Sequence, residues 1–161
     1  MSRVRRMLSE DADRAAQIAA AFPDAWTKKD FEDSLMREEA LLLAAEDDGD
    51  AYPADASKAV ADCGAGGILG FVIVYVSPDE AEIVDVAVDR EHQGKGVGRL
   101  LLKETIHELK CRGISRLVLE VREGNAPARA LYGSCGFSEL GIRKNFYSAP
   151  KESAVIMELN I

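Results

Sequence analysis

Residues 93–98 read Gln-Gly-Lys-Gly-Val-Gly and could bind an anion through the main chain. The three glycines leave neighbouring backbone N–H groups free of Cβ crowding, so a ligand can approach the backbone closely. An apolar, strand-like run at 83–88 precedes this segment, and a helix-like run beginning near Arg99 follows it. The first turn of such a helix adds N–H donors without an intrahelical partner and the positive end of the helix dipole. The pattern therefore predicts a phosphate-binding turn between a strand and a helix.

Positive charge gathers at this turn although the chain as a whole is acidic. Lys95, Arg99 and Lys103 lie in it or soon after it, whereas the formal net charge is -8. The glycine spacing matches neither the G-x-x-x-x-G-K-S/T pattern of nucleotide-triphosphate P-loops nor the G-x-G-x-x-G pattern of dinucleotide-binding folds. A flexible strand-to-helix connection without a ligand is the alternative for a glycine-rich turn taken alone.

Glu120 is an acidic side chain within the apolar run 117–121. Alternation along a strand places Glu120 and Arg122 on the same face. A carboxylate in such a setting could act as a general base, directly or through a water molecule. The alternative is a solvated carboxylate paired with Arg122, and Asp85 and Glu123 are the second-choice carboxylates.

A second motif, N-x-x-A-x-x-L-Y-x-x-x-G-F, follows farther along the chain and is formed by Asn125, Ala128, Leu131, Tyr132, Gly136 and Phe137. Together with Q-x-x-G-x-G after an apolar strand, it resembles the GNAT superfamily of acetyl-coenzyme A-dependent N-acetyltransferases. The resemblance implies a single α/β (α+β) domain over residues 1–161. It also implies a mixed central sheet of about seven strands with a splay between parallel strands four and five, flanked by about four helices.

The same resemblance implies the cofactor. Acetyl-coenzyme A would place its diphosphate in the glycine turn and its pantetheine arm along the preceding strand, which would bind it like an added strand. The expected cofactor-binding residues are Val86, Ala87, Val88, Gln93, Gly94, Lys95, Gly96, Val97, Gly98, Arg99, Asn125 and Tyr132. No metal is expected.

Within the superfamily, the chain most resembles the ribosomal-protein-alanine N-acetyltransferase (RimI) branch. The residues that carry this likeness are Phe22-Pro23 with Trp26 and Phe31, Leu119-Glu120-Val121-Arg122, Arg143-Lys144-Asn145-Phe146-Tyr147 and Ile156-Met157. The likeness implies that Glu120 is the general base and that Tyr132 assists the departing thiolate. It also implies a protein or peptide N-terminus as acceptor, such as that of a ribosomal protein. The expected acceptor-binding residues are Phe22, Trp26, Asp85, Asn145 and Tyr147.

Two alternatives remain open. The first keeps the chemistry but changes the acceptor to a broader range of peptides or to a small amine. The second is a non-catalytic acyl-coenzyme A-binding module, against which Glu120 and Tyr132 together argue. His92 and His107 are weaker candidates for the base, because His92 precedes the glycine turn and His107 lies on a helix face that looks exposed.

Composition restricts the class of protein. A chain of 161 residues with 47% hydrophobic residues suits one domain with one buried core. Its acidity argues against a nucleic-acid-binding surface. Cys63, Cys111 and Cys135 are odd in number and lack C-x-x-C spacing, so neither a zinc site nor a disulfide framework is predicted. Without an apolar run of roughly 18 residues or an apolar leader, we expect a soluble cytoplasmic protein with no membrane partner.

The elements that must position these groups follow from the residue pattern. Strands are predicted at 4–8, 40–45, 68–76, 82–88, 116–122, 138–147 and 154–159. Helices are predicted after Ser9 and Thr27 as N-caps, from near Arg99 to Arg112, and from Asn125 to Cys135. The strand-helix-strand unit favours a right-handed crossover, so strands four and five should be parallel neighbours.

Residues 47–67 lie between two predicted strands and are rich in Ala, Asp and Gly. They contain almost no large apolar side chain, so burial cannot offset the entropy lost on ordering. A mobile insertion without a catalytic role is therefore predicted.

Overall fold

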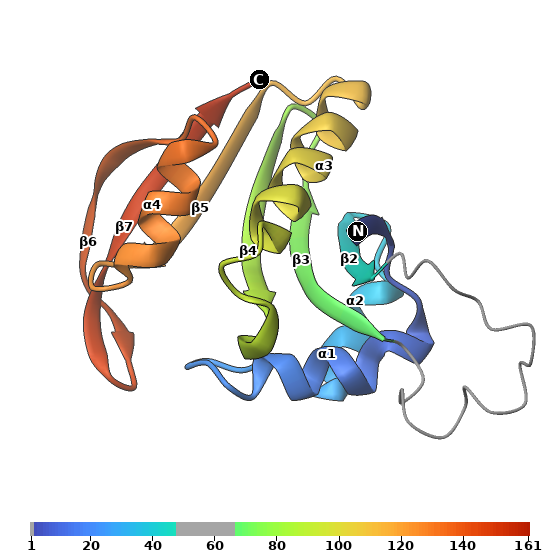
Figure 1. Cartoon of the computed structure of the whole chain (residues 1–161). Coiled ribbons are helices and arrows are strands. Elements are labelled where there is room, and N and C mark those ends of the chain that lie inside the picture. Colours follow the sequence, from blue (N-terminus) through green and yellow to red (C-terminus); the bar gives the residue numbers. More distant parts are fainter. Residues whose placement is uncertain (1, 48–66) are drawn as a thin grey trace, which may run out of the picture.

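A seven-stranded mixed sheet organises the part of the chain that the structure, a computed structural model, describes, residues 2–47 and 67–161 (Figure 1). The strand order is β1-β2-β3-β4-β5-β7-β6. The strands are β1 (Ser2–Arg6), β2 (Ala40–Asp47), β3 (Ile68–Val76), β4 (Glu80–Val88), β5 (Arg116–Arg122), β6 (Ser138–Ser148) and β7 (Lys151–Asn160). The helices are α1 (Ala12–Ala19), α2 (Lys28–Leu35), α3 (Val97–Cys111) and α4 (Ala126–Ser134), with short 3-10 turns at η1 (Ser9–Asp11) and η2 (Arg90–His92).

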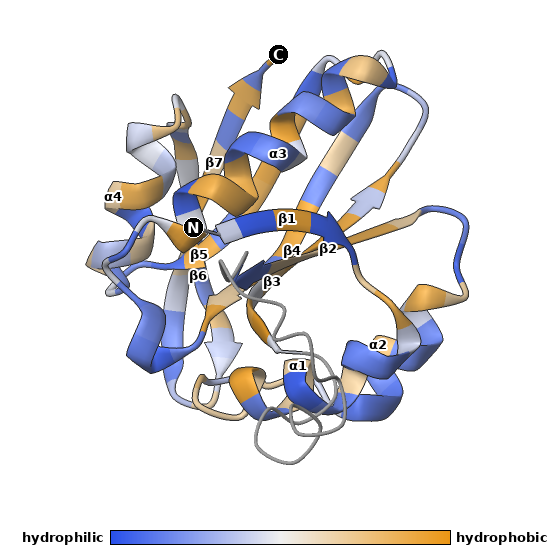
Figure 2. Ribbon diagram, turned by 45° about the vertical axis from the view of Figure 1, so that its right-hand side comes forward, coloured by the Kyte–Doolittle hydropathy of each residue, from blue (hydrophilic) through white to orange (hydrophobic). Residues whose placement is uncertain are grey.

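Helices cover both faces of the sheet and create two apolar layers. On one face, α1 and α2 pack Ile18 and Phe31 against Phe71 of β3. On the other face, α3 packs Leu101 and Leu109 against the sheet, and α4 adds Tyr132 to the same cluster. Figure 2 shows the corresponding mixture of hydrophobic and hydrophilic segments along α3. The predicted α/β class is confirmed.

The strands predicted at 68–76 and 116–122 have those bounds, and the other predicted strands differ only at their ends. The N-cap prediction for Thr27 is also confirmed, because its N–H donates to Asp30 Oδ2 at 2.8 Å and its Oγ1 accepts from the Asp30 N–H at 3.3 Å. Asn125 caps α4 through Oδ1, which accepts from the Ala128 N–H at 3.2 Å. The sequence therefore predicted the N-cap residues of both helices correctly.

The prediction that Ser9 caps the first helix is wrong. The carboxylate of Asp11 instead accepts from the Leu8 N–H at 2.8 Å and pairs with Arg5 at 2.7 and 3.0 Å. Asp11 is fully buried, so it must be paired, and Arg5 on β1 supplies the charge. As a result β1 ends at Arg6, and α1 begins only after the 3-10 turn.

The splay between β4 and β5 creates the space for a site. These strands are parallel, as predicted, but they pair only from Glu80 to Ile83 with Arg116 to Leu119. Beyond Ile83 the β4 edge that faces β5 has no strand partner, whereas β5 stays paired with β7 as far as Arg122. Figure 1 shows the two strands separating toward the glycine turn.

The predicted insertion at 47–67 lies almost wholly outside the described residues, so its character stays a prediction. Within the described ranges, no helix is long and apolar enough to cross a membrane. The described residues also contain no group of three or more His, Cys, Asp or Glu side chains placed to hold a metal ion.

Candidate functional site

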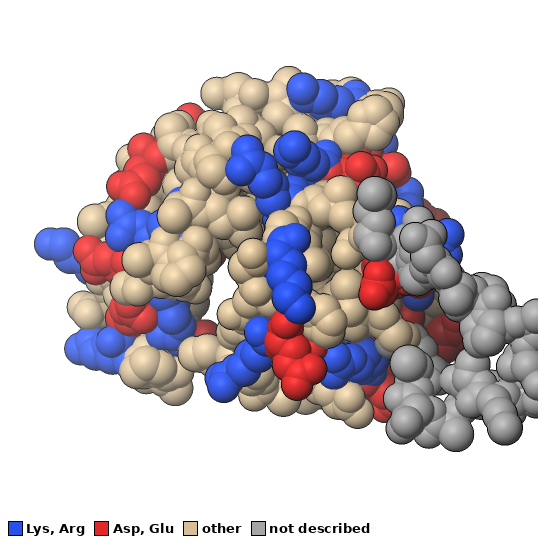
Figure 3. All heavy atoms as spheres, in the orientation of Figure 1, with Lys and Arg blue, Asp and Glu red and all other residues tan. Residues whose placement is uncertain are grey.

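The diverging strands open a cleft of about 790 Å³. A cleft of this size is large enough for a ligand of cofactor dimensions. It is lined by the end of β4, the glycine turn, the first turn of α3, α4, the end of β5, the α1–α2 connection and Tyr147. Figure 3 shows the surface hollowed between the side that carries α4 and the side that carries α3, with basic side chains on the α3 side.

The glycine turn has the geometry of an anion-binding loop at one end of this cleft. Gly94 and Gly96 have φ values of +74° and +85°, which glycine adopts far more easily than other residues. The Gln93 side chain donates to the Val88 carbonyl at 3.1 Å and fastens the turn to β4. The first hydrogen bond of α3 joins the Leu100 N–H to the Gly96 carbonyl at 3.0 Å, so the N–H groups before it are available to a ligand.

Space beside the turn is open. A Cβ added at Gly94 or Gly96 would meet no atom within 4 Å. The residues present therefore fit a diphosphate held by main-chain N–H groups at a helix N-terminus.

Gly98 serves the packing of the cleft walls. A Cβ there would lie 3.1 Å from Leu131 on α4 and 3.7 Å from Val88 on β4. The absence of a side chain lets α4 approach α3 closely.

Lys95, predicted to bind the cofactor, is exposed and is not among the residues that line the cleft.

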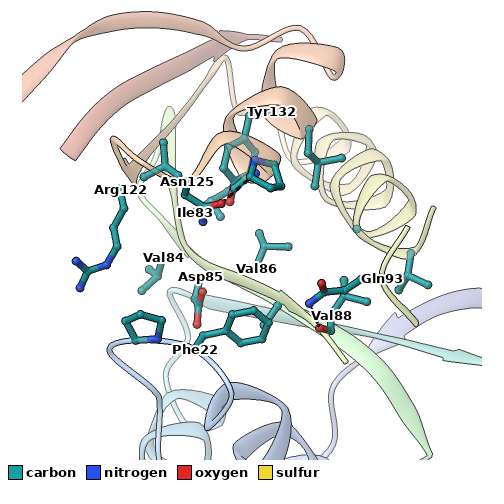
Figure 4. A pocket seen from close by; sticks show the side chains of 18 of the residues that line it. Phe22, Ile83, Val84, Asp85, Val86, Val88, Gln93, Arg122, Asn125 and Tyr132 are labelled. Atoms are coloured by element: carbon teal, nitrogen blue, oxygen red, sulfur yellow. Dashed lines mark hydrogen bonds between the residues drawn. The ribbon is translucent and has the colours of Figure 1, made fainter. Parts of the chain in front are cut away.

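Tyr132 points from α4 into the cleft (Figure 4) and is 8% exposed. Burial raises the pKa of its phenol well above the ordinary value, and the charge of Asp85 and the neighbouring Tyr147 raise it further. The hydroxyl therefore stays protonated at physiological pH and can donate a hydrogen bond. Its ring packs against Phe137, with centroids 5.8 Å apart.

Glu120 lines the cleft from β5, and its side chain is 21% exposed. The alternative of a pair with Arg122 is wrong, because Glu120 Oε1 lies 3.2 Å from Arg143 Nη1 on β6. It also borders a smaller hollow of about 250 Å³ beside Glu82 and Arg143. Glu120 thus borders both the cleft and this second hollow.

Asp85 lines the cleft from β4 and points toward Phe22 in Figure 4. Burial raises the pKa of its carboxyl to about 6, the charge of Asp24 raises it as well, and the Val86 N–H opposes both effects. In addition to Glu120, the cleft therefore holds the carboxyl group of Asp85, which changes charge near pH 6.

The predicted acceptor-binding residues divide into two groups. Phe22, Trp26, Asp85 and Tyr147 line the cleft. Asn145 does not: it is exposed, has a φ of +55°, and donates its N–H to Ser153 Oγ at 3.3 Å within the β6–β7 hairpin. Asn145 lies within β6 at the point where the register with β7 shifts between Arg143 and Tyr147, so a local irregularity of the strand accounts for its left-handed conformation.

Among the cofactor-binding predictions, every residue except Lys95 lines the cleft. Sequence reasoning missed several other lining residues, namely Asp24, Val84, His92, Val121, Arg122 and Leu131. Strand alternation from Glu120 was a usable signal for Arg122, whereas Asp24 gave none. His92 Nδ1 lies 2.9 Å from Asp89 Oδ2, which agrees with a structural role for this histidine.

Comparison with known proteins gives a consistent result. The profile of the acetyltransferase (GNAT) family matches residues 7–137. The ribosomal protein bS18-alanine N-acetyltransferase of Escherichia coli (strain K12) is 47% identical over 98 residues, which span 60% of this chain and 66% of that protein's length. A Bacillus subtilis (strain 168) protein, provisionally assigned the same activity, is 32% identical over 160 residues, 98% of this chain and 95% of its own length.

Solved structures resemble the whole chain. The crystal structure of the ribosomal-protein-S18-alanine N-acetyltransferase from E. coli has a TM-score of 0.82 and 34% identity, covering 100% of this chain and 94% of that one. Arabidopsis thaliana NAA60 in complex with acetyl-CoA has a TM-score of 0.82 at 17% identity, covering 100% and 99%, and shows a shared fold.

Proposed function

The chain belongs to the acetyltransferase (GNAT) family, and we propose that it transfers an acetyl group from acetyl-coenzyme A to the α-amine of a protein N-terminus. The observation that supports this most directly is one continuous cleft lined by the glycine turn, Tyr132 and Glu120. An anion-binding turn can hold the diphosphate of the cofactor, a protonated phenol can donate a hydrogen bond to the leaving sulfur, and a carboxylate can accept a proton from the amine. The entire chain would then act as one catalytic domain.

The cofactor would be held mainly by backbone groups. When bound, acetyl-coenzyme A supplies the activated acetyl thioester. The N–H groups of the glycine turn and the first turn of α3 would bind its diphosphate. The β4 edge at Val86, Ala87 and Val88, which lacks a strand partner toward β5, would hydrogen-bond the pantetheine arm.

One side chain would accept a proton from the acceptor, and another would donate a hydrogen bond to the leaving group. Glu120 would accept a proton from the acceptor ammonium, directly or through a water molecule, while Arg143 at 3.2 Å keeps its carboxylate in place. Tyr132, which burial keeps protonated, would donate a hydrogen bond to the leaving sulfur.

An α-amine with a pKa of about 7.7–8.0 is neutral in roughly a tenth of molecules at pH 7, whereas a lysine amine at about 10.4 is almost always charged. A modest base therefore suits an N-terminus better than a lysine.

For the acceptor, we propose an N-terminal alanine of a ribosomal protein, with the chain acting in the cytoplasm. The relatives in E. coli and B. subtilis are named for bS18-alanine acetylation, and the second of them aligns over 98% of this chain. Phe22, Trp26 and Tyr147 line the end of the cleft that would receive the peptide.

The test is to incubate the protein with acetyl-coenzyme A and peptides that differ only in their first residue, and to read the products by mass spectrometry. We expect acetylation of the α-amine, fastest for an N-terminal alanine. A matched peptide with a blocked N-terminus and a free internal lysine should remain unmodified. Preferential acetylation of that lysine, or of a small free amine, would refute the proposed acceptor.

A further inference from the structure

The side chain of Arg122, at the end of β5, reaches across the open end of the splay. Its Nη2 lies 2.7 Å from Asp24 Oδ2 in the α1–α2 connection, and its Nη1 lies 3.4 Å from Glu152 Oε1 on β7. The side chain is only 12% exposed although it carries a full charge. Two carboxylates from opposite sides of the cleft thus neutralise one guanidinium.

The same guanidinium also holds the β6–β7 turn. Nη1 donates to the Pro150 carbonyl at 2.9 Å, and Nη2 donates to the Ala149 carbonyl at 3.3 Å. The guanidinium carbon lies 4.1 Å from the centroid of the Tyr147 ring, within the range of a cation–π contact. These contacts, added to the two carboxylates, occupy the planar donor fork and one face of the group. A lysine could not make them all at once, because its ammonium is a point donor.

The segments that Arg122 joins form the two sides of the mouth of the cleft. Asp24 lies between Phe22 and Trp26, which line the cleft from one side, and Tyr147 lines it from the other. At the closed end, the β4–β5 ladder and the pair of Arg116 with Glu80 already connect the two halves. At the open end β4 and β5 are not paired. There, within the described residues, the Asp24–Arg122 ion pair connects the two sides of the cleft.

Further contacts hold the partners of Arg122 in place. Asp24 has a φ of +58°, a left-handed conformation that is strained for a residue with a side chain and must be held by its surroundings. Glu152 Oε2 accepts from the Gly124 N–H at 2.6 Å, directly before the Asn125 cap of α4. The partners of Arg122 are therefore themselves fixed to segments that line the cleft.

We propose that Arg122 is a positioning residue that fixes the separation and orientation of the α1–α2 connection and the β6–β7 turn, so that the mouth is preformed for the acceptor. This inference rests on the proposed function, because it assigns the acceptor to that mouth. Arg122 then contributes to acceptor binding, whereas cofactor binding and the chemical step stay with other residues. Preorganisation of a binding site lowers the cost of ordering it when the ligand arrives.

Steady-state kinetics of Arg122→Gln with the preferred peptide test the proposal. The acceptor KM should rise about tenfold or more, as expected when charge-assisted hydrogen bonds in a partly buried site are lost. The kcat and the affinity for acetyl-coenzyme A should change little. Arg122→Lys, which can still reach Asp24, should recover part of the loss, and Asp24→Asn should raise KM in the same direction.

Arg116→Gln is the matched control. Arg116 lies on the same face of β5 and also pairs with two carboxylates, Glu80 and Glu158, but at the closed end of the splay. Its replacement should leave the acceptor KM unchanged. A fall in kcat with unchanged KM in Arg122→Gln would overturn the proposal, because Arg122 would then act in the chemical step.

A second readout needs no acceptor. Trp26 is the single tryptophan of the chain, so acrylamide quenching of its fluorescence reports how firmly the α1–α2 connection is held. Quenching should increase in Arg122→Gln and stay at the wild-type level in Arg116→Gln. Unchanged quenching in folded Arg122→Gln, checked by its melting temperature, would overturn the proposal. If the wild type acetylates no peptide, the proposed function fails, and the quenching result still decides the role of Arg122.

Discussion

Glu120 and Tyr132 occupy different environments, and the difference suits their proposed roles. Tyr132 is buried, which raises its pKa and keeps it a donor, whereas Glu120 is partly exposed beside Arg143. A donor and an acceptor of protons thus face one cleft from α4 and β5. Neither residue type alone is informative in a sequence, because tyrosines usually pack and glutamates are usually solvated.

Glu120→Gln should lower kcat/KM for the peptide about a hundredfold at pH 7, the lower end of the range for a general base. Part of the loss should be recovered at higher pH, where more of the acceptor amine is already neutral. Acetyl-coenzyme A affinity, measured by calorimetry, should not change. Glu123→Gln, an exposed carboxylate just after β5, is the control. Full activity in Glu120→Gln together with loss in Asp85→Asn would show that the base is assigned to the wrong carboxylate.

Asp85 should make the stability of the fold depend on pH. Its folded pKa of about 6 exceeds the ordinary 3.8, so the folded state holds the proton more tightly than the unfolded state. The charged form therefore costs stability, by up to about 3 kcal/mol above pH 6, and this cost disappears as pH falls toward 4. Asp85→Asn should raise the free energy of unfolding at pH 8 and leave it nearly unchanged at pH 4.

Urea denaturation at the two pH values measures this effect. Asp79→Asn, at an exposed turn position between β3 and β4, should change stability little at either pH. A destabilised Asp85→Asn at pH 8 would mean that the carboxylate makes stabilising contacts that outweigh its desolvation. A gain in the free energy of unfolding on replacing Asp85 would be typical of a functional site, where a binding group is kept at some cost to the stability of the fold.

At the scale of elements, the glycine turn and α3 form one unit. Gly96→Val would force a β-branched residue into a left-handed conformation and place its side chain in the open space beside the turn. Affinity for coenzyme A should fall at least about tenfold in calorimetry. Gly113→Val is a close control, because Gly113 follows the other end of α3, has a φ of +79°, and has equally open space. Gly113→Val should lose a similar amount of stability but retain its affinity for coenzyme A. An equal loss of affinity in both variants would refute the proposal that the glycine turn binds the diphosphate.

Most elements were predictable because their signals are local. The apolar run of β3 and the capping pairs at Thr27 and Asn125 involve residues near one another in the sequence. The start of α1 was not predictable in this way. Its start is set by Asp11, whose carboxylate is fully buried in the folded chain and pairs there with Arg5 of β1. Ser9 was the better local candidate, but tertiary burial decided the outcome.

The cleft was predictable in part for a similar reason. Residues on β4, the glycine turn and α4 belong to contiguous motifs, so their common location followed from the order of elements. Arg122 joins Asp24 to Glu152, residues that are 128 positions apart, and no spacing rule connects them. Asn145 illustrates the opposite error, since this residue lies two positions before a lining tyrosine but occupies an irregular position within β6 and donates its N–H to Ser153 on β7.

At the scale of the whole molecule, the splay makes the cofactor a structural link between two halves. The glycine turn and β4 lie on one side of the cleft and α4 on the other, while direct β4–β5 pairing ends at Ile83. A ligand that contacts both sides binds the folded state alone and must raise its stability. At a concentration about a hundred times Kd, the gain is about 2.7 kcal/mol. For a domain of this size, each kcal/mol raises Tm by about 2–4 °C.

Coenzyme A should therefore raise the Tm by about 5–10 °C in a thermal-shift or calorimetric scan, and the shift should grow with the logarithm of its concentration. Gly96→Val should show almost no shift, whereas Gly113→Val should shift as much as the wild type from a lower starting Tm. Free adenosine, which lacks the diphosphate and the pantetheine arm, should produce little effect because it cannot occupy the turn and β4 together. An equal shift with adenosine would place the binding energy outside the glycine turn and would contradict the proposed mode of cofactor binding.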